Sequence, residues 1–81
     1  MNIQLIQGNF NAKDALAIIT QMIHVKIKYH ESKISSNNNE EDIKFREAKI
    51  KRLQKDLFDI RNFILDSGGK INIQSEIHLS Q

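Results

Sequence analysis

The chain contains no cysteine, and this absence removes several classes of function at once. Disulfide bonds, thiolate zinc sites and thiol catalysis all require cysteine. With 81 residues, the chain is also near the lower limit for a self-sufficient core. A small protein without such covalent or metal staples usually needs very good helix packing or a second subunit.

Long hydrophobic runs are also missing. The longest uncharged stretch, residues 15–25, falls well short of the roughly 20 apolar residues that a membrane-spanning helix needs. The first residues have neither the basic start nor the continuous apolar core of a secretory signal. The net charge of +2 is too small to imply a polyanionic partner by itself. We therefore expect a soluble, cytoplasmic protein with no membrane partner.

Residues that usually carry catalysis or bind metal ions show no useful pattern. His24, His30 and His78 lack the spacings of zinc sites, and the first two lie on different faces of a helix. The acidic residues 40–42 fit a first helical turn, where they stabilise the positive end of the helix dipole. There is no phosphate-binding loop and no nucleophile elbow. The sequence therefore predicts a protein that is not an enzyme and has no catalytic residues, metal site or cofactor.

The most informative positive feature is a nearly unbroken heptad of apolar residues between positions 43 and 64. Spacings of alternately three and four residues place these side chains on one seam of a helix, and such a seam needs a partner helix. Only Arg46 interrupts the pattern. The seam consists of Ile43, Ile50, Leu53, Leu57, Ile60 and Ile64.

The partner helix is predicted over residues 12–34, with Asn11 as its N-cap, and it carries two apolar stripes. Between residues 15 and 27 it is apolar around more than half its circumference, so it must be covered on two sides. A single intramolecular helix covers only one of them. The first stripe, expected to pack on the seam, is Leu16, Ile19, Ile23 and Ile27. The second stripe is Ala15, Ile18, Met22, Val25 and Tyr29.

A short strand is predicted at each end of the chain. Residues 2–7 alternate between apolar and polar until Ile6 breaks the alternation, and Gly8 is expected to end the strand. Residues 70–79 alternate with a period of two, which is typical of a half-buried strand. Its apolar face includes Ile71, Ile73, Ile77 and Leu79.

Polar residues 35–39 are expected to connect the two helices. Asn39 suits the N-cap of a second helix over residues 40–67, which contains no proline or glycine, and Gly68 suits a left-handed C-cap. The sequence therefore predicts one α+β domain over residues 1–81, with the order βααβ. A long antiparallel, coiled-coil-like helical hairpin is flanked by two terminal strands, which pair into a small antiparallel sheet.

The surplus apolar stripe and the small sheet together favour a homodimer. A two-stranded sheet alone is marginal in water, and apolar surface on this scale is uncommon in soluble monomers. We therefore expect a non-enzymatic protein–protein interaction or structural module that acts as a homodimer. Docking of a different protein on the same surface stays open as an alternative. The expected interface residues are Ala15, Ile18, Met22, Val25, Ile71, Ile73 and Ile77.

A cluster of basic residues in the second helix leaves nucleic-acid binding as the main alternative. Between positions 44 and 55, lysine and arginine dominate, and Glu47 is the only acid. A solvated helix face is the favoured interpretation, because phosphate binding usually comes with a larger basic excess. The candidate contacts are Lys44, Arg46, Lys49, Lys51, Arg52 and Lys55.

Overall fold

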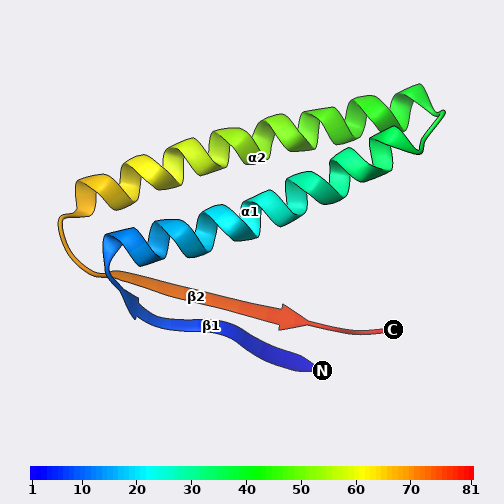
Figure 1. Ribbon diagram of the computed structural model, residues 1–81. Helices are drawn as coiled ribbons and strands as arrows, with labels where there is room; N and C mark the ends of the chain where they lie inside the picture. The colour runs from blue at the N-terminus through cyan, green and yellow to red at the C-terminus, as the bar shows by residue number, and fades with distance from the viewer.

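A computed structural model describes the whole chain, residues 1–81, and confirms the βααβ order. The elements are β1 (Asn2–Phe10), α1 (Ala12–Ser35), α2 (Glu40–Ser67) and β2 (Ile71–His78). The two helices form an antiparallel hairpin, and the two strands form a separate layer that joins the hairpin at one end (Figure 1). The strands pair antiparallel in a two-stranded sheet.

The helices begin and end at residues with suitable capping chemistry. The side chain of Asn11 accepts a hydrogen bond from the backbone N of Asp14 at 2.8 Å. The side chain of Asn39 accepts one from the backbone N of Glu41 at 2.9 Å. Each bond satisfies a backbone N–H group that has no partner within the first helical turn. α2 ends at Gly68, whose φ of 67° is a left-handed conformation that glycine adopts without steric cost.

The heptad residues of α2 are the ones turned away from solvent. Each of them is buried or half-buried, and most positions between them are exposed. Arg46 also lies in this seam, where its Nε donates to Asp42 Oδ2 at 3.1 Å. Its Nη1 donates to His30 Nδ1 of α1, also at 3.1 Å. A polar link between the helices thus replaces the apolar contact that the heptad lacks at this position.

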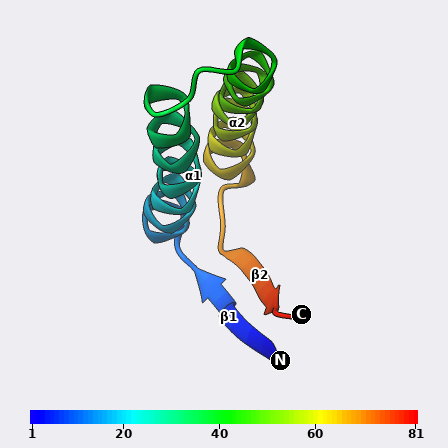
Figure 2. The same cartoon turned by 90° about the vertical axis from the view of Figure 1, so that its right-hand side faces the viewer.

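The main core lies where the hairpin meets the sheet. Ile64 of α2, 1% exposed, packs with Ala15 of α1, 0% exposed, and with Ile71 and Ile73 of β2. Phe10 of β1 packs against the same cluster. Away from this core the two layers diverge, so the molecule has the outline of a V (Figure 1). Figure 2 shows α1 on the same side of the molecule as β1, and α2 on the same side as β2.

The sequence indicated that the first strand ends at Gly8, but β1 continues to Phe10. The pairing register shifts between Gln4 and Ile6, so that Leu5 is an extra residue in a β-bulge. The bulge returns Ile6 to the face of the sheet that meets the helices, where it packs against the core. The broken alternation therefore marked a bulge and not the end of a strand. Gly8 itself has a φ of 150°, a conformation that residues with a Cβ atom rarely adopt.

Replacing Ile64 by alanine should lower the free energy of unfolding by about 2–5 kcal/mol, because it leaves a cavity at the centre of the core. Its neighbour Leu65 is 60% exposed, so Leu65→Ala is a matched control that should stay within about 0.5 kcal/mol of the wild type. Urea denaturation curves of the wild type and the two variants, all recorded at the same protein concentration, measure the difference. Equal midpoints for the two variants would contradict the assigned core.

Candidate interaction surface

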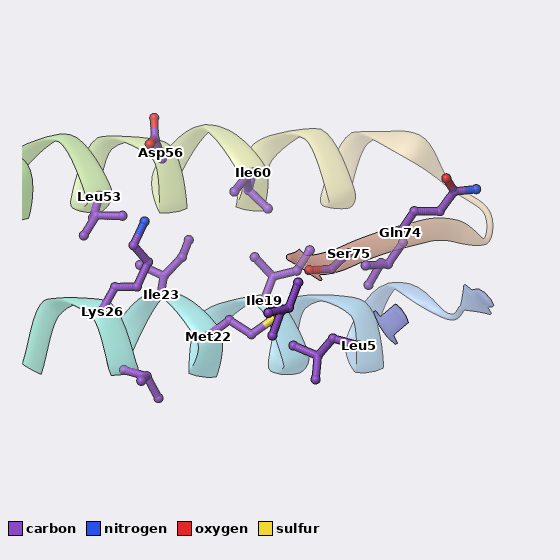
Figure 3. A pocket seen from close by; sticks show the side chains of 13 residues that line it. Leu5, Ile19, Met22, Ile23, Lys26, Leu53, Asp56, Ile60, Gln74 and Ser75 are labelled. Atoms are coloured by element: carbon purple, nitrogen blue, oxygen red, sulfur yellow. The ribbon is translucent and has the colours of Figure 1, made fainter. Parts of the chain in front are cut away.

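The divergence of the two layers leaves an apolar groove of about 700 Å³ between the hairpin and the sheet. Figure 3 shows Leu53 and Ile60 pointing from α2 towards α1 within it. The charged residues in its lining are Lys26 and Asp56. Its apolar lining consists of Leu5, Ile19, Met22, Ile23, Val25, Leu53, Ile60, Ile73 and Ile77.

From Ala15 to Val25, the second apolar stripe of α1 becomes more exposed to solvent with distance from the core. Its residues are spaced by three or four positions and so share one helix face. Ala15 is fully buried, Ile18 and Met22 are half-buried, and Val25 is 68% exposed. Exposure rises in this order because the sheet diverges from the helix and no other element of the chain covers that face. The groove is therefore closed at the core and open at the other end.

The predicted interface residues divide between the chain's own core and its surface. Three of them, Ala15, Ile71 and Ile73, are buried in the core at the closed end of the groove. Val25 and Ile77 are exposed, and both line the groove. Ile18 and Met22 of α1 are half-buried and have part of their surface free. A partner would thus meet the open half of the stripe and the free end of the sheet.

The free end of the sheet carries further apolar residues, outside the predicted interface. Met1, Ile3, Leu5 and Leu79 are all exposed, and Ile3 lies directly opposite Ile77 in the register. Met1 and Leu79 exchange backbone hydrogen bonds of 2.9 and 2.8 Å, so the ladder extends beyond the two strands. The sequence signal was present, because apolar residues recur at every second position up to the bulge.

The predicted basic residues do not form one uniform cluster. Arg46 lies in the helical seam, and Lys49 Nζ lies 5.1 Å from the centre of the Phe45 ring. Lys55 Nζ donates to Asp59 at 2.9 Å, and this hydrogen bond, with the attraction between the charges, raises the pKa of Lys55 above its ordinary value. Among the predicted basic residues, those without such an intramolecular contact in the structure are Lys44, Lys51 and Arg52.

The surface of the chain thus carries an apolar groove and the two free edges of a sheet. No group of three or more histidine, aspartate or glutamate side chains is placed so that it could hold a metal ion. None of the helices combines the length and the apolar character needed to cross a membrane. No known protein family, no curated protein and no solved structure matches this chain.

Proposed function

We propose that this protein is a non-enzymatic interaction module that acts as a homodimer, with the groove and the free end of the sheet as its contact surface. The observation that carries the proposal is the apolar surface left open at the mouth of the V. Val25 and Ile77 stand on opposite walls of the groove, and both are exposed. Contiguous apolar surface of this kind usually marks a site of protein–protein contact.

A second copy suits this surface because a two-fold contact uses the same patch twice. Each chain supplies an uncovered helical stripe and a strand with unpaired backbone groups, and each needs a cover for both. Two copies related by a two-fold axis can satisfy both needs at once. The small sheet, which is marginal by itself, then gains width from the second chain.

The composition of the groove supports a binding role over a catalytic one. Its polar residues are Lys26, Asp56, Gln74 and Ser75, set among aliphatic side chains. Nucleophilic or acid–base catalysis needs a reacting group within hydrogen-bond reach of a base that another group orients. The hydrogen bonds of this protein include no bond between any two of these four side chains. We therefore propose that the groove binds a protein surface and performs no chemistry.

Nucleic-acid binding takes second place because several of the candidate basic residues have intramolecular contacts. Lys44, Lys51 and Arg52 are exposed and support it, whereas Arg46 helps to hold the helices together. A salt titration of binding to duplex and single-stranded nucleic acids separates the two functions. Several phosphate contacts would give a steep loss of affinity with salt. No binding at low salt would remove this alternative.

Replacing Met22 by lysine should weaken the association of the chains by at least about tenfold, because it places a charge in the apolar contact surface. Met22 is half-buried on the open stripe, so the helical hairpin should stay folded. Phe58→Lys is the matched control, since Phe58 is an exposed apolar residue of α2 that does not line the groove. Sedimentation equilibrium at micromolar concentrations measures the dissociation constants, with circular dichroism to verify helix content.

Two results would count against the proposal. A wild-type mass near 9.4 kDa across the whole concentration range would show that the chain is a monomer. Equal weakening by the two lysine variants would place the contact outside the groove.

A further inference from the structure

We propose that the second copy docks along the free edge of β2, antiparallel and in a register centred on Ser75, so that the two small sheets become one continuous sheet. This inference rests on the proposed homodimer and specifies its contact. Each two-stranded sheet has two free edges, one on β1 and one on β2. The regularity of the strands, the self-complementary sequence of β2 and the position of α2 all select the edge of β2.

The two edges differ in regularity. β1 contains the bulge at Leu5, which disrupts its ladder and bends the strand. Bulges of this kind are one of the ways in which proteins keep an edge strand from pairing with another chain. β2 is free of proline and of bulged residues from Ile71 to His78, and its side chains alternate regularly. The edge of β2 is therefore the better template for an added strand.

The backbone groups available at this edge follow from the pairing with β1. Met1 and Leu79 exchange hydrogen bonds in both directions, so Leu79 directs its N–H and C=O groups towards β1. In an antiparallel ladder this direction alternates from residue to residue. The odd-numbered residues of β2 therefore bond to β1, and the even-numbered ones direct their groups to the free edge. These free residues are Asn72, Gln74, Glu76 and His78.

The face of α2 that lines the groove also carries an exposed aromatic side chain. Phe63 follows Asp56 and Ile60 at spacings of seven and three, so it lies on the helix face that lines the groove. It is nevertheless 67% exposed. α2 lies on the β2 side of the molecule (Figure 2), so widening the sheet at β2 adds a strand on the side of this helix.

The register centred on Ser75 brings apolar residues together on the face that meets the helices. It places Ile73 opposite the partner's Ile77, and Ile71 opposite the partner's Leu79. In each pair, one residue is buried in its own chain and the other is exposed. Ser75 lies opposite the partner's Ser75 on the two-fold axis. The exposed end of each sheet thus comes to lie beside the packed core of the other copy.

The same register is also the best one for the polar face. It pairs Gln74 with the partner's Glu76, and Asn72 with the partner's His78, so every free backbone group of β2 finds a partner. A shift of two residues in one direction places Glu76 opposite the partner's Glu76, and like charges directly opposite are destabilising. A shift in the other direction places His78 opposite the partner's Lys70, which lies outside β2, so the paired region is shorter. The sequence of β2 is therefore complementary to itself when centred on Ser75.

A single cysteine at the axis tests the register, because the chain has no other thiol. Ser75 would form a non-hydrogen-bonded pair, in which the Cα atoms lie about 4.5 Å apart, within the range that a disulfide bridges. Ser75→Cys should therefore oxidise to a covalent dimer at least about tenfold faster than Ser32→Cys, since paired thiols have a high effective concentration. Ser32 is exposed on α1, far along the hairpin from the sheet, and is the matched control.

A proline variant tests the edge independently of the thiol. Gln74→Pro removes an N–H group that the isolated chain leaves free, so the pairing with β1 stays intact and the association should be lost. Gln7 lies directly opposite Gln74 and directs its own N–H to the edge of β1, so Gln7→Pro is the matched control. Circular dichroism checks that both variants keep their helices, and sedimentation equilibrium gives their masses.

The outcomes distinguish this inference from the homodimer itself. Rapid oxidation of Ser75→Cys, with dissociation of Gln74→Pro alone, supports pairing along β2. A wild-type dimer in which the two cysteine variants oxidise at the same rate would overturn the β2 contact and leave the homodimer standing. Dissociation by Gln7→Pro but not by Gln74→Pro would move the contact to β1. A monomeric wild type would overturn both proposals.

Discussion

Two β-strands lie about 4.8 Å apart, whereas the axes of two packed helices lie about 8–10 Å apart, so a two-stranded sheet is too narrow to cover a helical hairpin. In this protein the sheet packs mainly beneath α1, and the hairpin extends well beyond it (Figure 1). One end of the hairpin therefore has a core around Ile64, while the stripe that continues to Val25 has no cover. The narrow sheet leaves part of the hairpin uncovered, and the divergence of the two layers opens the groove between them.

The same mismatch links the proposed dimer to the edge of β2. The sheet can be widened only at an edge. Widening at β2, on the side of α2 (Figure 2), pairs the free backbone groups and, in the proposed register, places the exposed Ile77 and Leu79 beside the partner's Ile73 and the partner's Ile71. Burial of apolar surface and completion of the ladder then favour the same contact, which gives the association a specific geometry and not merely a tendency to aggregate.

The helices and their order could be predicted from the sequence, because capping residues and the heptad are local signals. Arg46 was recognised as an interruption, but its bond to His30 depends on the alignment of the two helices, which the sequence does not specify. The bulge at Leu5 was misinterpreted because a bulge and a strand end break the alternation in the same way. Assigning Ala15 to the core and Val25 to the surface required the angle between the layers, which no local pattern encodes.

Amide hydrogen exchange of the unmodified protein, well above micromolar concentration, tests most directly whether a second chain completes the sheet. The amides of Ile73 and Ile77 donate to β1 and should exchange slowly in any folded state. The amides of Gln74 and Glu76 face the free edge of the single chain. If the second copy pairs with β2, these two amides should be protected as strongly as their neighbours. Fast exchange at Gln74 and Glu76, alternating with slow exchange at Ile73 and Ile77, would show that the edge of β2 is open in solution and would contradict the account.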